Sequence, residues 1–298
     1  MIREAALAVL ALLQGAPAPA PPVDYADPAS LVAVAGTRRI ALVCAGRGAP
    51  TVVLTAGAGA PASSWRLVQP EIARRTRTCA WDRAGFGRSD ASPARQTADE
   101  TARDLARALA SAKVTGPLVL VGHSIGAYET LLLADRLGPR LAGMVLVDPS
   151  LPDMFRVTGD DPARLMGPIA APFRACAAAL RAGTPPPAGS FVCAGPVAKL
   201  DTAVSFLDSA GESARLVVAP DRTYGAIPLI VLTAGPRRTL ASAWDIGHDQ
   251  LAALSSRGVN RYVKDSGHMM HRERPDAIIA AVGDVLSAVS LSSHTTTR

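Results

Sequence analysis

Short runs of apolar residues alternate along this chain with longer stretches whose apolar positions recur every three or four residues. The first pattern is typical of buried strands, and the second of helices that cover a sheet. The sequence predicts strands at residues 31–34, 40–43, 52–55, 79–81, 118–121, 144–147, 229–232 and 261–263. It predicts helices at residues 64–74, 98–112, 125–137, 239–255 and 275–288. This order indicates an α/β fold with a mostly parallel central sheet flanked by helices.

The alternation stops between residues 151 and 224. This stretch is rich in proline, holds two cysteines and has no strong strand signal. We expect an irregular insertion above the carboxyl ends of the core strands, where open α/β sheets bind ligands. The predicted organisation is therefore a core of residues 28–150 and 225–290, a cap of residues 151–224 and a disordered tail of residues 291–298.

The first twenty residues have the outline of a secretory signal peptide and the start of a proline-rich linker. Glu4 departs from that outline, because the segment before the apolar stretch is normally basic. Beyond this segment no apolar run is long enough to cross a bilayer, so we expect no stable membrane insertion. The sequence predicts a secreted or periplasmic protein, with a cytoplasmic location as the alternative.

The four cysteines are an even number, which fits export. Cys44 and Cys79 lie at the end of and inside strands that can be neighbours, while Cys176 and Cys193 bracket a proline-rich loop. We expect each of these pairs to form a disulfide, and the alternative is four reduced, buried thiols. None has the C-x-x-C spacing of a zinc site, so the sequence predicts no metal.

The net charge of +6 is spread along the chain rather than gathered in one block. Few aromatic residues lie among the arginines, and there is no nucleic-acid-binding motif, so the charge indicates a solvated basic surface. We therefore expect no nucleic-acid partner. A mild attraction to anionic substrates or surfaces is compatible with this charge.

Residues 122–126 form the most informative motif, Gly-His-Ser-Ile-Gly, directly between a predicted strand and a predicted helix. A serine in this setting is typical of a nucleophile elbow. In so tight a turn, side chains two residues before and after Ser124 would collide, so Gly122 and Gly126 are needed there. The sequence predicts an exposed Ser124 hydroxyl. The alternative is a glycine-rich turn with an idle serine.

Five segments stand in an order and at a spacing that match a known family. They are PTVVLTAG at 50–57, DRAGFGRSD at 82–90, GHSIG at 122–126, VLVDPS at 145–150 and SGH at 266–268. On these segments the chain resembles the α/β-hydrolase fold family, especially its capped, esterase-like members, across nearly all its length after the linker. The resemblance implies a nucleophile, an acid and a histidine in that chain order, and no cofactor.

The resemblance points to His268 as the catalytic histidine, because it follows the last predicted strand. His271 is the alternative. The other three histidines fit less well: His123 lies inside the elbow, His248 in a predicted helix, where a surface or packing role is expected, and His294 in the tail.

The acid is harder to assign from the sequence. No carboxylate follows the strand at 229–232, which is its place in many relatives, but Asp148 follows the strand at 144–147. We favour Asp148, whose alternative role is to anchor a turn with Pro149. Asp245 and Asp249 on the later helix are further candidates, and Asp265 is too close to His268.

The resemblance also implies an oxyanion hole formed by the backbone N–H groups of Ile125 and Ala58. The family usually has His-Gly before the second donor, and Ala56 departs from that pattern. Residues 82–83 and 88–90 are polar and charged. We expect them to brace the loop after a core strand, through turn hydrogen bonds and an ion pair, rather than to bind substrate.

These features predict a serine hydrolase that cleaves a small or medium ester through Ser124, His268 and Asp148. The alternatives on the same fold are an aminopeptidase, a C–C bond hydrolase and a cofactor-free haloperoxidase; a non-catalytic binding protein is a further one. A serine at this position argues against a haloalkane dehalogenase or an epoxide hydrolase, whose nucleophile is aspartate. An aminopeptidase needs acidic groups in the cap, and several are available there, among them Asp153, Asp160, Asp161, Asp201, Asp208 and Glu212.

Overall fold

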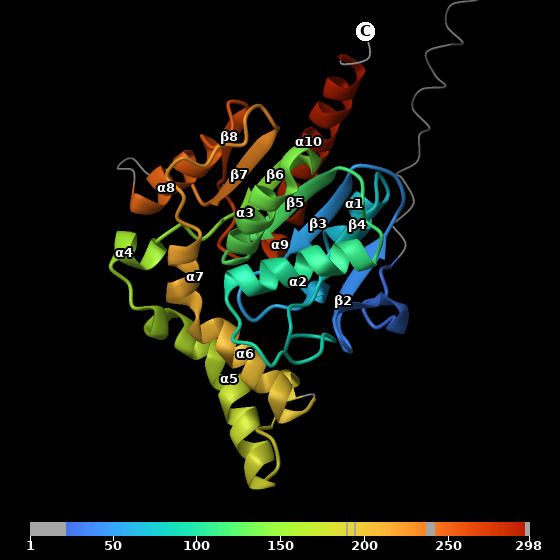
Figure 1. Ribbon diagram of the computed structural model, residues 1–298. Coiled ribbons are helices and arrows are strands. Elements are labelled where there is room, and N and C mark those ends of the chain that lie inside the picture. The colour runs from blue at the N-terminus through green and yellow to red at the C-terminus, as the bar shows by residue number, and fades with distance from the viewer. Residues whose placement is uncertain (1–21, 189, 194, 237–241, 296–298) are drawn as a thin grey trace, which may run out of the picture.

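A twisted sheet of eight strands forms the centre of the molecule in this computed structural model, which describes residues 22–188, 190–193, 195–236 and 242–295 (Figure 1). The predicted signal peptide lies outside the described residues. The strands are β1 (Leu31–Ala35), β2 (Arg38–Ala45), β3 (Thr51–Thr55), β4 (Thr78–Trp81), β5 (Leu118–His123), β6 (Leu141–Val147), β7 (Leu229–Ala234) and β8 (Gly258–Val263). Every predicted strand is therefore present.

The strands lie in the order β1-β2-β4-β3-β5-β6-β7-β8. β2 is antiparallel to both β1 and β4, and every pairing from β4 to β8 is parallel. The residues of β3 and β5 are buried throughout, as expected for parallel strands covered on both faces. The mostly parallel α/β sheet predicted from the sequence is confirmed, and the carboxyl ends of its parallel strands share one edge.

Helices pack on both faces of the sheet (Figure 1). Helices α2 (Ala98–Ser111), α3 (Gly126–Leu137) and α8 (Ala243–Ala252) share one apolar core with the sheet. Helices α1 (Gln69–Ala73), α9 (Met270–Glu273) and α10 (Pro275–Thr295) share the core of the other face. Short 3₁₀ turns occur at η2 (Pro28–Ser30), η3 (Ala62–Trp65) and η4 (Gly138–Arg140).

Three predicted helices have different bounds in the structure. The helix expected at 64–74 is divided into η3 and α1, because Pro70 falls in the first turn of α1, where proline is tolerated. Helix α8 starts only after Ser242, whose side chain accepts a hydrogen bond from Asp245 N–H. Helix α10 continues to Thr295, into the stretch expected to be a disordered tail, and residues 296–298 lie outside the described part.

The segment between β6 and β7 is helical rather than irregular. It contains α4 (Met154–Thr158), α5 (Pro162–Ala182), η5 (Phe191–Cys193), α6 (Val197–Asp208) and α7 (Ala210–Leu216). Prolines usually break helices, which is why the sequence predicts no order here, yet α5 runs through Pro168 and Pro172. We call residues 151–224 the helical insertion.

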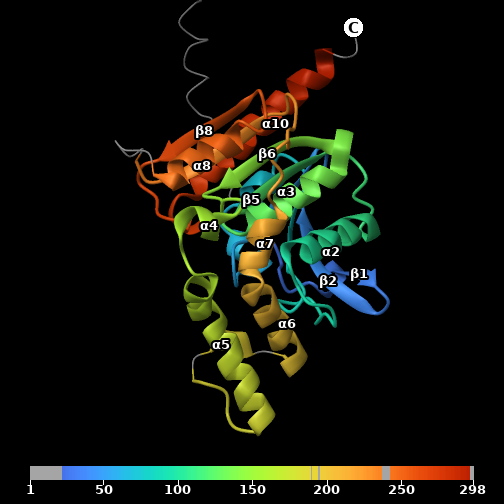
Figure 2. The same ribbon diagram turned by 60° about the vertical axis from the view of Figure 1, so that its left-hand side comes forward.

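The helical insertion extends from the sheet as a separate layer, with α5 and α6 side by side (Figure 2). Phe86, in the loop after β4, anchors it to the core. Its ring lies 5.5 Å from that of Phe173 in α5 and 5.8 Å from that of Phe206 in α6, both in edge-on geometry. Such pairs stabilise beyond their burial, so the insertion has a defined position relative to the core.

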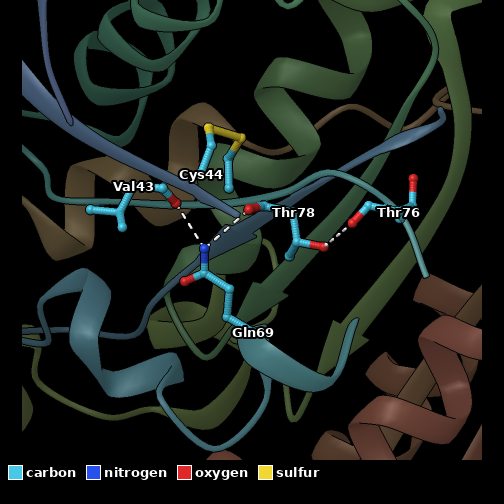
Figure 3. The surroundings of a disulfide bond; sticks show 6 residues. Val43, Cys44, Gln69, Thr76 and Thr78 are labelled. Atoms are coloured by element: carbon cyan, nitrogen blue, oxygen red, sulfur yellow. Dashed lines mark hydrogen bonds between the residues drawn. A yellow bond between two sulfur atoms is a disulfide. The ribbon is translucent and has the colours of Figure 1, made fainter. Parts of the chain in front are cut away.

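Both predicted disulfides are present, Cys44–Cys79 and Cys176–Cys193. Cys44 and Cys79 are directly opposite each other in the register of β2 and β4. Figure 3 shows the Gln69 side chain beside this bridge, where its amide donates to the carbonyls of Val43 (2.8 Å) and Thr78 (3.0 Å). The Cys176–Cys193 bridge links α5 to η5 inside the insertion.

Among the described residues, no helix combines the length and apolar character that a bilayer span requires.

The Cys176–Cys193 bridge gives a stability prediction. It closes a loop of 17 residues, so the chain-entropy model assigns it about 3 kcal/mol. We expect the Cys176→Ala/Cys193→Ala double variant to lose about that much free energy of unfolding, measured in urea under non-reducing conditions. Equal unfolding free energies for the two proteins would contradict this contribution.

Candidate active site

Three sequence-predicted residues meet at the edge where the parallel strands end. Ser124 follows β5, Asp148 follows β6, and His268 lies in the loop after β8. The Ser124 Oγ atom is 2.9 Å from His268 Nε2, and His268 Nδ1 is 2.6 Å from Asp148 Oδ2. Because a carboxylate only accepts hydrogen bonds, Nδ1–H donates to Asp148, which leaves Nε2 to accept from the Ser124 hydroxyl.

The backbone of Ser124 has a left-handed conformation, with φ of 54°. A Cβ atom on Gly122 would lie 2.3 Å from Thr130 Oγ1, and one on Gly126 would lie 2.5 Å from the Ala56 carbonyl oxygen. Both positions therefore require glycine, as the sequence predicts. This turn places Ser124 just before α3 and directs its side chain towards His268.

The Asp148 carboxylate is held from two sides. Its Oδ1 atom accepts a hydrogen bond from Ala234 N–H at the end of β7 (3.0 Å), while Oδ2 accepts from His268. Burial by itself would raise the pKa of Asp148, but these two hydrogen bonds outweigh it and the pKa is lowered. Asp148 is thus a carboxylate at neutral pH, whereas the His268 side chain is about half exposed, at 47%.

The other candidate carboxylates have different partners. Asp245 forms a capping box with Ser242 at the start of α8. Asp249 accepts a hydrogen bond from the Asn260 side chain, and the exposed Asp265 lies 3.9 Å from Arg274. Asp148 is the aspartate that the structure brings to His268.

His268 and His271 both lie against a third histidine, His123. The rings of His268 and His271 are each 4.8 Å from the ring of His123, between centroids. His123 Nε2–H donates to the backbone carbonyl of His268 (2.8 Å), so it supports the loop that carries this residue. Burial lowers the pKa of His123 to about 3, which keeps the ring neutral. Apart from the place of His123 in the elbow, nothing in the sequence points to this supporting role.

His248 is a packing residue rather than a site residue. It is fully buried in α8, where it contacts the carbonyl of Pro149 (2.9 Å) and the hydroxyl of Thr233 (2.8 Å). Burial lowers its pKa. Its contacts support the turn that follows Asp148. The side chain of His294 lies outside the described part of the chain.

The two candidate oxyanion donors are close to Ser124 in the chain or in space. Ile125 comes directly after Ser124 and precedes the first residue of α3. Ala58 comes directly after Gly57, and Gly57 is so close to the nucleophile that a Cβ atom added to it would lie 3.3 Å from the Ser124 Cβ atom. Among the described residues, neither backbone N–H donates to a protein acceptor. Two unpaired N–H groups beside a serine are suited to hold a developing negative charge.

The loop with Ala58 is held by a buried arginine. Arg83 donates to the carbonyls of Ala56 (2.6 Å) and Gly57 (3.1 Å) and forms an ion pair with Glu129 of α3. Arg83 and Glu129 are both almost fully buried. The bracing role expected for residues 82–83 is therefore present, and it includes an ion-pair partner, Glu129, for which the sequence contains no signal.

Asp82, the neighbour of Arg83, contributes to the same bracing. Its carboxylate accepts hydrogen bonds from the backbone N–H groups of Ala62 (2.6 Å) and Arg88 (2.8 Å). Ser89 donates to the Asp82 carbonyl (2.6 Å), and the Asp90 carboxylate accepts from Arg39 N–H (2.7 Å). Residues 82–90 thus act on loop structure, as the sequence predicts.

A cavity of about 510 Å³ adjoins the site on the side of Ala58. Met269 and His271, just after His268, line one part of it, and Phe173 of the helical insertion lines another. No group of three or more His, Cys, Asp or Glu side chains in the described part of the chain is arranged to hold a metal ion. The cavity thus lies next to Ala58, the second candidate oxyanion donor, and next to the residue that follows His268.

The buried His271 predicts a pH dependence of stability. Burial, and then the positive charges of Arg272 and Arg66, lower its pKa from 6.5 to about 4. The unfolded chain therefore takes up this proton at a higher pH than the folded chain. The stabilisation is complete above pH 6.5 and is lost as the pH falls from 6.5 towards 4.

Between these two pKa values, we expect the unfolding free energy of the His271→Phe variant to change less steeply with pH than that of the wild type. The difference in slope should be about 1.4 kcal/mol per pH unit, the contribution of one titrating proton. The measurement is the free energy of unfolding in urea at a series of pH values. A wild type and variant with the same slope in this range would contradict the assignment.

Comparison with known proteins places these features in a wider group. Residues 52–281 match the model of a family described as the alpha/beta hydrolase family. The protein YqjL of Bacillus subtilis (strain 168) is 28% identical over 245 residues, which cover 80% of this chain and 84% of that protein.

Solved structures have the same fold. A thermophilic esterase from Thermogutta terrifontis superposes with a TM-score of 0.63 at 20% identity, covering 87% of this chain and 98% of the esterase. The enzyme Est816, described as degrading N-acyl homoserine lactones, superposes with a TM-score of 0.60 at 18% identity, covering 85% and 99% of the two chains. At these identities the likeness shows the fold.

Proposed function

The chain belongs to the alpha/beta hydrolase family, and on that premise we propose that it is a serine hydrolase that cleaves a small or medium carboxylic ester. The observation that carries the proposal is the continuous line of hydrogen bonds from Ser124 through His268 to Asp148. This is the arrangement by which a serine hydroxyl loses its proton as it attacks a carbonyl.

In the first half of the proposed reaction, Ser124 Oγ bonds to the ester carbonyl carbon while its proton passes to His268 Nε2. The carbonyl oxygen becomes an oxyanion, held by the N–H groups of Ile125 and Ala58. Asp148 stabilises the imidazolium and keeps the ring in orientation. The bond to the leaving alcohol then breaks, and Nε2 returns the proton to that alcohol.

In the second half, water takes the place of the alcohol. His268 Nε2 removes a proton from the water as its oxygen bonds to the carbonyl carbon of the acyl-enzyme. The bond to Ser124 Oγ then breaks, and Nε2 returns the proton to Ser124 as the acid leaves. Each oxyanion-hole donor lowers the activation barrier by about 3–4 kcal/mol in the enzymes where this has been measured.

The charges of the helical insertion support an ester over a peptide with a free amine. Among the described residues, none of its seven acidic side chains lines the cavity beside Ala58. Four of them form ion pairs with arginines: Asp153 with Arg156, Asp201 with Arg181, Asp208 with Arg174 and Glu212 with Arg95. Asp161 instead caps α5, so the cavity lacks the carboxylate that an aminopeptidase would need.

We propose that the helical insertion is a cap over the site, because Phe173 and Val192 from α5 and η5 form one wall of the cavity. We also propose that the protein is exported. The two disulfides support this, since such bonds persist in oxidising compartments. Free thiols in protein purified from its native compartment would argue for a cytoplasmic location.

The identity of the nucleophile is tested with a fluorophosphonate probe and with p-nitrophenyl esters of increasing chain length. We expect the wild type to be labelled and the Ser124→Ala variant to lose labelling, with kcat reduced by roughly 10⁶-fold. A variant that still labels, or an active wild type that does not label, would refute the serine mechanism.

The identity of the acid is tested by comparing Asp148→Asn with Asp245→Asn. We expect the first to lower kcat by roughly 10⁴-fold, because the asparagine amide cannot hold His268 in the required tautomer. The second weakens one half of the capping box, in which the Asp245 carboxylate accepts from Ser242 N–H, so it should cost at most about 1 kcal/mol of unfolding free energy and leave kcat near the wild-type value. The opposite pattern in two folded variants would assign the role to Asp245.

A further inference from the structure

The cavity beside Ala58 has two walls of different chemistry. One wall comes from α5 and η5 and is apolar, with Ile169, Pro172, Phe173 and Val192. Another part of the lining comes from η3 and α9 and from the residues next to them; beside Met269 it has the polar and basic side chains of Ser63, Ser64, Arg66, His271 and Arg272. The cavity therefore suits a molecule with an apolar part and a polar or charged part.

Arg66 and Arg272 are the charged side chains of this lining, and both are positive. Within the described part of the chain neither of them forms an ion pair, whereas many other arginines do, such as Arg38 with Asp104. Glu273, the acidic neighbour of Arg272, accepts a hydrogen bond from Gly267 N–H instead. Two unpaired guanidinium groups thus lie at one small cavity.

The two guanidinium groups come from segments far apart in the chain but act on the same place. Both are close enough to His271 for their charges to add to burial in lowering the pKa of that ring. His271 itself lines the cavity and is neutral. In the part of the chain that the structure describes, no acidic side chain lines the cavity to cancel the two charges, and the whole sequence carries a net charge of +6.

We propose that the substrate is an ester that also carries an anionic group, a carboxylate or a phosphate-like group, and that Arg66 and Arg272 bind this group. Guanidinium is suited to both, because its fork of N–H donors matches the oxygens of carboxylate and phosphate. The apolar wall takes the chain that joins the anion to the ester. The proposal rests on the ester hydrolase function above and adds the chemical class of substrate.

The test compares esters that differ in one terminal group. p-Nitrophenyl valerate and mono-p-nitrophenyl glutarate have acyl chains of equal length, one ending in a methyl group and the other in a carboxylate. A third ester, ending in a phosphonate, distinguishes the two kinds of anion. Phenyl valerate and 4-carboxyphenyl valerate repeat the comparison with the charge on the alcohol side.

We expect the wild type to favour the anionic member of at least one pair by about tenfold in kcat/KM, which corresponds to about 1.4 kcal/mol. This ratio should fall towards one in Arg66→Gln and in Arg272→Gln, and Arg272→Lys should retain part of it. The matched control is Arg103→Gln, which also removes one positive charge, but from the exposed surface of α2 on the other face of the sheet. The control should keep the wild-type ratio.

A wild type that favours the neutral member of every pair, or a preference that survives in both arginine variants, would overturn the proposal. Failure of ester hydrolysis itself would show differently, as no turnover of any ester. Binding of glutarate by calorimetry then decides. About tenfold weaker binding to Arg66→Gln than to the Arg103→Gln control supports the anion site, and equal or absent binding overturns it.

Discussion

The left-handed backbone at Ser124 is the constraint on which the site depends. The turn between β5 and α3 is tight enough that the chain must adopt this conformation, at a cost of about 1–3 kcal/mol for a residue other than glycine. It is possible only because Gly122 leaves room for Thr130 of α3, and Gly126 leaves room for the Ala56 carbonyl after β3. The result is a serine at the start of a helix, beside the ends of three neighbouring strands, with its hydroxyl directed at His268.

The surroundings hold this turn with buried polar contacts. Arg83 and Glu129 connect the loop after β3 to α3, so the candidate donor at Ala58 and the turn at Ser124 are parts of one rigid unit. His123 performs a similar task for the loop of His268. Removing one partner of a buried ion pair strongly destabilises a protein, because the other partner is left as an uncompensated buried charge. These contacts therefore preserve geometry more than they add net stability.

Local sequence patterns predicted most of the fold but only part of the candidate site. Apolar runs identified every strand, and the elbow was visible because glycine spacing is a local property. The choice between Asp148 and Asp245 was not local, since it depends on which strand end lies beside His268. Glu129 looked like any acidic residue on a helix. The helical insertion was mistaken for irregular chain because α5 tolerates Pro168 and Pro172, which its packing against α6 and the core permits.

The proposed mechanism requires a covalent acyl-enzyme on Ser124, which mass spectrometry of a rapidly quenched reaction can detect. The wild type is mixed with a p-nitrophenyl ester, quenched in acid within milliseconds to seconds and digested. We expect the peptide containing Ser124 to gain the mass of the acyl group during the p-nitrophenol burst, and the adduct to be lost as turnover proceeds. Ester turnover without any adduct, or with the adduct on another residue, would contradict it.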